Sequence, residues 1–161
     1  MNIFNQQCCQ KTFSTFRAIV FTIVFTNLCI QSEAQTTQDS IRQTVDRMFL
    51  GMKNADSAMV VGVFHPSAVL QTIVGDGSIR TQGYTEMGAV MKKLRAGQLD
   101  ERITYGSIQV DGNLASVWTP YRLYFDGNFM HCGANSFHLV RTNGAWKIVH
   151  LIDTRRKDCD Q

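Results

Sequence analysis

The chain has 161 residues, of which 44% are hydrophobic and 18% charged, and it carries a formal net charge of +3. Such a length suits one domain, and a charge so close to neutral gives no indication of a nucleic-acid partner. The basic cluster from Arg155 to Lys157 is typical of a solvated chain end.

The first 34 residues have the three parts of a secretory signal peptide. Residues 1–17 carry two basic and no acidic side chains, and residues 18–30 form an apolar run. Ser32, Glu33 and Ala34 follow as a small-x-small cleavage site. A membrane-spanning helix needs ~20 apolar residues, so this shorter run predicts no stable membrane anchor. We expect a signal peptide over residues 1–34, export to the periplasm or outside the cell, and one domain over residues 35–161.

Cleavage after Ala34 would remove three of the five cysteines and leave Cys132 and Cys159. An even number in an exported protein favours a disulfide, which would stabilise the fold by ~3–4 kcal/mol if unstrained. Two independent thiols are the alternative. No cysteine or histidine spacing resembles a zinc site, so we expect no metal and no cofactor.

Two helices are predicted at the start of the domain. In residues 36–55 apolar side chains recur at helical spacing, which indicates an amphipathic helix. They are Ile41, Val45, Met48, Phe49 and Met52. Asp56 is a typical N-cap for a second helix, Ser57 to Phe64. His65-Pro66 ends that helix, because the residue before proline avoids the α region.

A strand and a third helix follow. Residues 67–74 are predicted as the strand, and Gly75-Asp76-Gly77 as its turn. After Gly83 a helix with one apolar stripe is expected to stop at Gly97. Three amphipathic helices need a second layer to cover their apolar stripes.

Residues 103–153 are predicted to form a four-stranded antiparallel meander that supplies this layer. Its turns are Asp111-Gly112, Asp126-Gly127 and Asn143-Gly144. Such pairs favour two-residue hairpins, because these residues adopt positive φ at low cost. The predicted class is therefore α+β, with three N-terminal helices packed on a curved antiparallel sheet.

The three turns also fix the register, which decides which side chains share a face. Val110 would oppose Asn113, Phe125 would oppose Asn128, and Thr142 would oppose Ala145. One face, the aromatic face, would then hold Ile103, Tyr105, Trp118, Arg122, Tyr124, His131, Asn135, Phe137, Leu139, Trp146, Ile148, His150 and Ile152. The other, the small-residue face, would hold Ile108, Val110, Val117, Thr119, Tyr121, Leu123, Cys132, Ala134, Ser136, His138, Val140, Lys147, Val149 and Leu151.

Several motifs of this chain match a known superfamily. They are Phe64-His65-Pro66, Val117-Trp118-Thr119-Pro120-Tyr121, Asp126-Gly127, His131-Cys132-Gly133, Phe137-His138-Leu139-Val140-Arg141, Gly144-Ala145-Trp146-Lys147-Ile148 and Asp153-Thr154-Arg155. On these residues the chain resembles the nuclear-transport-factor-2-like superfamily. It is most similar to the exported bacterial proteins grouped as putative lumazine-binding or ketosteroid-isomerase-like.

The resemblance covers residues 36–158 and implies a cone-shaped α+β barrel with a pocket between the helices and the concave sheet. It also implies frequent dimers through the sheet. It does not imply one activity, because this fold hosts isomerases, dehydratases, epoxide hydrolases and interaction domains. Enzyme members place an aspartate base in the pocket and a tyrosine or second acid at its end. Tyr105, Tyr124 and Asp153 do not reproduce that spacing, so we assign no catalytic residue.

The ligand pocket is expected on the aromatic face. Its predicted members are His131, Tyr105, Trp118, Asn135, Tyr124 and His150. His131 is the central polar group, since imidazole can act as acid, base or hydrogen-bond donor near neutral pH. The alternative is a buried histidine that ties the sheet to a helix.

Three functions remain open at this point. The first is an exported protein that binds a small apolar or aromatic molecule. The second is a cofactor-free acid–base enzyme of isomerase or lyase type, with His131 as acid or base and Tyr105 or Tyr124 at the developing oxyanion. The third is a non-catalytic, dimerising interaction module. The lack of a convincing buried carboxylate favours binding over catalysis.

A homodimer is expected through the small-residue face. There, apolar side chains separated by small residues would form a patch that a lone soluble domain rarely exposes. The patch would consist of Val117, Leu123, Val140, Val149 and Leu151.

Overall fold

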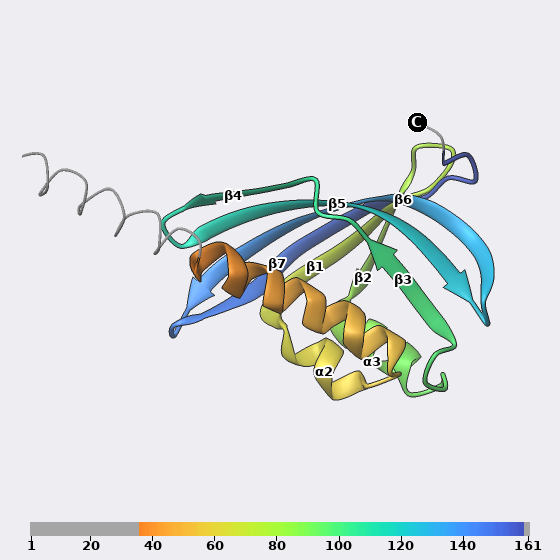
Figure 1. Cartoon of the computed structure of the whole chain (residues 1–161), viewed down its shortest axis with the longest axis horizontal. Helices are drawn as coiled ribbons and strands as arrows, with labels where there is room; N and C mark the ends of the chain where they lie inside the picture. Colours follow the sequence, from red (N-terminus) through yellow and green to blue (C-terminus); the bar gives the residue numbers. More distant parts are fainter. Residues whose placement is uncertain (1–35, 160–161) are drawn as a thin grey trace, which may run out of the picture. The chain divides into compact units, whose positions relative to one another are not determined.

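Helices cover one side of a curved β-sheet in the computed structural model, which describes residues 36–159 (Figure 1). From Gln38 onward the residues cluster as one unit. The predicted signal peptide lies outside the described residues. Among residues 36–159, no helix is both long and apolar enough to cross a membrane.

The first helix spans residues 36–53, and two shorter helices follow, α2 (Ser57–Gly62) and α3 (Tyr84–Met91). Asp56 caps α2 as expected, because its Oδ1 accepts a hydrogen bond from the Met59 backbone at 2.9 Å. Both α2 and α3 are shorter than predicted. α3 also follows two strands, so the helices are not all N-terminal.

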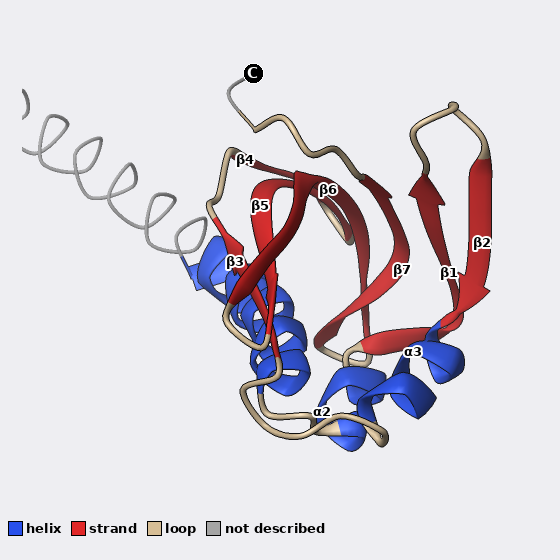
Figure 2. Cartoon of the chain, turned by 90° about the vertical axis from the view of Figure 1, so that its right-hand side faces the viewer, coloured by secondary structure: helices blue, strands red, loops and turns tan. Residues whose placement is uncertain are grey.

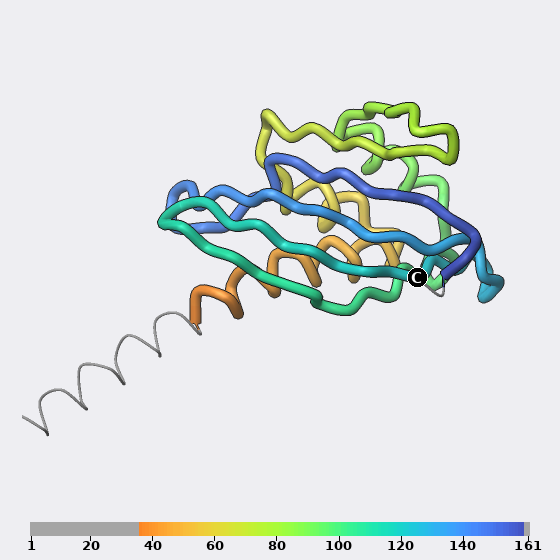
Figure 3. Tube along the Cα trace, turned by 90° about the horizontal axis from the view of Figure 1, so that it is seen from above, coloured from red at the N-terminus to blue at the C-terminus, as the bar shows by residue number. Residues whose placement is uncertain are grey.

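The sheet has seven strands, which are β1 (Phe64–Ile73), β2 (Ile79–Gly83), β3 (Leu99–Ile103), β4 (Ser107–Asp111), β5 (Leu114–Phe125), β6 (Asn128–Thr142) and β7 (Ala145–Thr154). Their order is β2-β1-β7-β6-β5-β3, and β4 also pairs with β5 (Figure 3). β1 runs parallel to β7, so the sheet is mixed rather than antiparallel throughout. It curves over the helices without closing into the predicted barrel, since β2 and β3 remain its two ends (Figure 2).

Two of the three predicted hairpin turns are confirmed. Phe125 pairs with Asn128 and Thr142 with Ala145, and the four residues inside these turns have positive φ. In the third hairpin Asp111 pairs with Leu114, so the turn is one residue later than predicted.

Two β-bulges shift the register in ways that the turns do not reveal. Between β5 and β6, Tyr124 pairs with Phe129 but Leu123 pairs with His131, which leaves Met130 without an opposite residue. Between β6 and β7, His138 pairs with His150 while Leu139 pairs with Ile148, so Val149 is the extra residue. Each bulge moves all later side chains of the pair to the other face.

The predicted faces are therefore wrong along β5 and the end of β7. Val117, Phe137 and Leu151 share the concave face, where their exposed fractions are 1%, 0% and 8%. Trp118 lies on the convex face and is 46% exposed. The apolar patch expected on the small-residue face does not exist in that form, because two of its members are part of the core.

The core fills the space between the concave face and the helices. The first helix buries the predicted stripe, including Ile41, Val45 and Met48. Its Phe49 ring meets the Phe137 ring edge-on, with centroids 6.1 Å apart. This contact fixes the helix across β6 and leaves room on the side of β1, β7 and α3, where the cavity lies.

Candidate functional site

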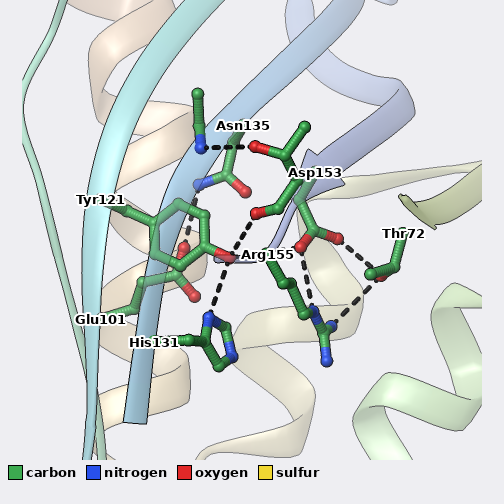
Figure 4. A network of polar contacts seen from close by, with 9 residues as sticks. Thr72, Glu101, Tyr121, His131, Asn135, Asp153 and Arg155 are labelled. Carbon is green, nitrogen blue, oxygen red and sulfur yellow. Dashed lines mark hydrogen bonds and ion pairs between the residues drawn. The ribbon is translucent and has the colours of Figure 1, made fainter. Parts of the chain in front are cut away.

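A cavity of about 290 Å³ opens between the first helix, α3 and the concave face of the sheet. Its volume is at the lower end of the range typical of small-molecule pockets. One part of its wall is apolar and rich in methionine: Met48, Met52, Leu70, Met87, Val90, Met91, Leu99, Leu123 and Leu151. The other part is polar, and most of it is one cluster drawn from five strands and the chain that follows β7 (Figure 4). We call the polar cluster Thr72, Glu101, Tyr121, His131, Asn135, Asp153 and Arg155.

Glu101 of β3 stands at the centre of the polar cluster. Its Oε1 accepts a hydrogen bond of 2.9 Å from the Asn135 amide, and the same Nδ2 lies 3.4 Å from the Thr119 hydroxyl. Burial raises the pKa of the Glu101 carboxyl to about 7, with a smaller contribution from the charge of Asp153. Glu101 is thus an acid that can gain or lose a proton near neutral pH.

Tyr121 of β5 links β6 to the last strand, β7, within the polar cluster. Its hydroxyl lies 2.9 Å from the Thr154 carbonyl oxygen, 3.3 Å from Asp153 Oδ2 and 3.2 Å from His131 Nδ1. The phenol has one proton, which it donates to one of the two acceptor oxygens. The His131 Nδ1–H then donates to the phenol oxygen, and this tautomer leaves Nε2 as an acceptor. Burial raises the pKa of the phenol and lowers that of the imidazole, so both groups are neutral at pH 7.

Asp153 and Arg155 form the third part of the cluster. The Arg155 guanidinium donates to Asp153 Oδ2 at 3.1 Å and to the Thr72 hydroxyl at 3.2 Å. The Thr72 hydroxyl also donates to Asp153 Oδ1 at 2.6 Å, which is possible because β1 and β7 are parallel neighbours. Arg155, the one lysine or arginine among the described residues that line the cavity, is therefore already paired with a carboxylate.

The C-terminal tail keeps this part of the cluster in place. Cys132 and Arg156 exchange backbone hydrogen bonds of 3.0 and 2.9 Å, and Cys132 is joined to Cys159 by a disulfide. Beside Cys132, Gly133 lets the Thr154 carbonyl approach so closely that a Cβ atom would lie 1.8 Å from its oxygen. The position of Arg155 thus depends on the tail's contact with β6.

Two of the six predicted pocket residues, His131 and Asn135, line the cavity. The other four lie elsewhere. Trp118 is on the convex face, and His150 is also there, stacked on His138 and bonded to Gln71 Oε1 at 3.0 Å. These two placements correct the prediction, and the bulges are the reason.

Tyr105 and Tyr124 are also away from the cavity. The Tyr105 hydroxyl bonds to Asp46 Oδ1 at 2.7 Å and so ties the sheet edge to the first helix. The Arg102 guanidinium lies over the Tyr124 ring, with its Cζ atom 4.2 Å from the ring centroid. The same ring contacts Phe129. Neither tyrosine can serve as the oxyanion donor of this pocket.

The sequence prediction missed Glu101, Tyr121 and Asp153. A local signal existed for Glu101, because it alternates with the apolar Leu99 and Ile103 and must share their face in a strand. No local signal marked the other two, since their face depends on the bulges.

A larger hollow of about 780 Å³ lies on the other side of the first helix, beside α2 and Trp146. It includes Asp46 and Arg47 but none of the residues of the polar cluster. We place the site in the smaller cavity, since buried groups with shifted pKa values converge there. Across residues 36–159, no three His, Cys, Asp or Glu side chains are grouped to hold a metal ion.

Comparison with known proteins identifies the family and the fold of the chain. The model of the family described as "Putative lumazine-binding" matches residues 36–151. No curated protein matches the sequence. An NTF2-like protein of unknown function from Shewanella baltica OS155 has a similar structure, with a TM-score of 0.63 and 16% identity over 76% of this chain and 96% of that chain. An NTF2-like protein with a cystatin-like fold from Novosphingobium aromaticivorans reaches a TM-score of 0.64 at 16% identity, over 81% and 88% of the two chains. Likeness at this identity establishes the α+β NTF2-like fold.

Proposed function

The chain belongs to the family described as "Putative lumazine-binding", and from this membership we propose that it binds a small organic molecule in the cavity beside Glu101 and Asn135. The observation that carries the proposal is the two-part wall of that cavity. Methionine and leucine side chains can cover a flat apolar body, while a few polar groups converge at one end. Pockets that bind small molecules combine these two features.

Methionine suits such a wall because its flexible, polarisable side chain adapts to the shape of a ring. Four methionines, two from the first helix and two from α3, line this cavity. Asn135 is 4% exposed and uses its Nδ2 for two internal hydrogen bonds, whereas no described residue bonds to its Oδ1. That oxygen supports the proposal, since a ligand N–H could bond to it.

Lumazine is the first probe, and Asn135→Leu is the variant that tests the site. We expect the wild-type protein to bind lumazine and the variant to bind it at least tenfold more weakly, because a lost buried hydrogen bond costs ~1–3 kcal/mol. Titration followed by lumazine fluorescence measures both affinities. Asn128→Leu is the matched control, since Asn128 is exposed at the start of β6 and should leave the affinity unchanged. Equal affinity in the Asn135 and Asn128 variants would refute the assignment of the site.

Acid–base catalysis is a second candidate, and Glu101 is the observation that favours it. A carboxyl group with a pKa of about 7, close to a neutral imidazole and a phenol, is suited to move a proton at neutral pH. The reaction class would be isomerisation or elimination in the same cavity. This candidate requires that Glu101→Gln abolish proton exchange from a bound ketone, and it fails if the exchange persists.

We also propose a homodimer through the convex face. On this face a stretch of side chains has no Asp, Glu, Lys or Arg, and Lys147, opposite Val140, lies at its border. The stretch consists of Val69, Gln71, Trp118, Ser136, His138, Val140, His150 and Ile152. Exposed sheet faces of monomers are usually polar, and a 46%-exposed tryptophan in such a setting supports contact with a second copy.

Trp118→Lys is expected to convert this dimer to a monomer, because the substitution replaces the exposed tryptophan by a charge in each copy and the two charges would meet in the interface. Sedimentation velocity of wild type and variant at micromolar concentration measures the change. Leu50→Lys is the control, since Leu50 is similarly exposed, at 51%, but lies on the first helix. A wild-type protein that sediments as a monomer would rule out the dimer.

A further inference from the structure

Within residues 36–159 Glu101 forms no ion pair, although two arginines are near it and the charge of Arg155 acts on it from a distance. Arg102 is the next residue on β3, but its side chain points to the other face and bonds to Asp100 at 2.9 Å. Arg155 lines the same cavity, but its guanidinium is shared between Asp153 and Thr72. A half-buried carboxyl group that forms no ion pair is costly to ionise, so the burial of Glu101 favours its protonated form.

One oxygen of Glu101 is available to a ligand. Oε1 accepts the hydrogen bond from Asn135, and no described residue bonds to Oε2. Among residues 36–159, every fully buried side-chain nitrogen or oxygen has a hydrogen-bond partner. Oε2 is therefore open to the cavity that Glu101 lines. In the protonated acid, the hydroxyl on this oxygen can donate one hydrogen bond to a bound molecule.

Among the groups that face Glu101, the Asn135 amide and the Arg155 charge favour the carboxylate, but burial outweighs both and raises the pKa. Tyr121 from β5 and His131 from β6 are neutral, Asp153 and Arg155 pair with each other, and the first helix and α3 contribute methionines. The burial that raises the pKa of Glu101 to about 7 would increase when a ligand displaces water from the cavity.

We propose that the pocket selects an uncharged ligand that presents a carbonyl-type oxygen to the protonated Glu101 carboxyl group. This inference rests on the proposed binding function and adds the chemical class of the ligand. A carboxylate or phosphate ester is excluded, because its charge would face Glu101 and Asp153 while Arg155 is already engaged. Binding then takes up a proton whenever Glu101 is ionised in the free protein.

A matched pair of probes, 2-naphthamide and 2-naphthoate, tests the proposal. They share one apolar body and differ in charge at the polar group. We expect the amide to bind at least tenfold more tightly than the carboxylate at pH 7.5, as measured by ligand-observed NMR. The affinity for the amide should be constant below about pH 7 and fall up to tenfold per pH unit above it.

Two variants show whether Glu101 is responsible. Glu101→Gln should make the affinity for the amide independent of pH between 6 and 9, because an amide donates without titrating. Asp100→Asn is the control, since Asp100 lies on the other face of β3, and it should keep the wild-type pH profile. Equal binding of both probes, or the same pH profile in Glu101→Gln as in wild type, would overturn the inference but leave the binding function standing. If neither probe nor lumazine binds at pH 6, the binding function fails and the inference fails with it.

Discussion

Replacing Gly133 with alanine should detach the C-terminal tail from the sheet and disrupt the polar cluster. A Cβ atom at this position would lie 1.8 Å from the Thr154 carbonyl oxygen and 2.9 Å from Cε1 of the Tyr121 ring. The first of these atoms belongs to the backbone, so no side-chain rotation can relieve the clash. Overpacking of this kind costs ~1–3 kcal/mol and sometimes more. We expect the upper end of that range, because the tail must move.

The expected loss is measurable in stability and in binding. Urea unfolding should show a free energy of unfolding lowered by about 3 kcal/mol, and lumazine binding should weaken because Tyr121 and Arg155 lose their positions. Gly75→Ala is the matched control, since a Cβ there would have no neighbour within 4 Å. An exposed substitution of that kind usually changes stability by less than ~0.5 kcal/mol. Two variants of equal stability would show that the tail is not packed as the structure has it.

Removing the disulfide should also lower the free energy of unfolding by a large amount. Replacing Cys132 and Cys159 with serine opens a link between residues 27 positions apart, which the chain-entropy model values at ~3–4 kcal/mol. Most of that change arises because the unfolded chain gains conformations. We expect urea unfolding of the double variant at a lower midpoint and with a steeper slope, because the unfolded chain without the link is less compact and exposes more surface.

Reduction of the wild-type protein provides the control for this double variant. Its midpoint in a thiol-free reductant should match that of the serine variant, since both lack the covalent link. A difference below ~1 kcal/mol between oxidised and reduced protein would contradict the prediction. It would mean that the disulfide restricts the unfolded chain less than the chain-entropy model assumes.

The sequence was informative where structure depends on neighbouring residues. The helical stripe from Ile41 to Met52, the cap at Asp56 and the turns at Asp126 and Asn143 were all readable, because each is set by a few adjacent side chains. The short, mostly polar β2 was missed, since Ile79 is its one large apolar residue. The parallel pairing of β1 with β7 joins segments that no local pattern connects.

Only some of the side chains that line the candidate site could be assigned to its face from the sequence, and the bulges explain why. His131 and Asn135 both lie on the cavity wall because they are on β6 in phase with the buried Phe137. Trp118 and His150 were placed on the wrong side because Met130 and Val149 each add one unpaired residue. Neither residue marks a bulge chemically, so a pattern based on alternation alone cannot detect the shift.

The parallel pairing of β1 with β7 has a consequence for the order in which the protein can fold. β1 ends at Ile73, yet its partner begins at Ala145, so most of the chain must be synthesised before these strands meet. Until then β1 can pair only with β2, and its other edge stays open to other chains. Contacts so far apart in sequence slow folding and lengthen exposure to aggregation. Thr72 and Asp153 meet across this last seam, so the ligand site is completed in the same late step that protects the sheet.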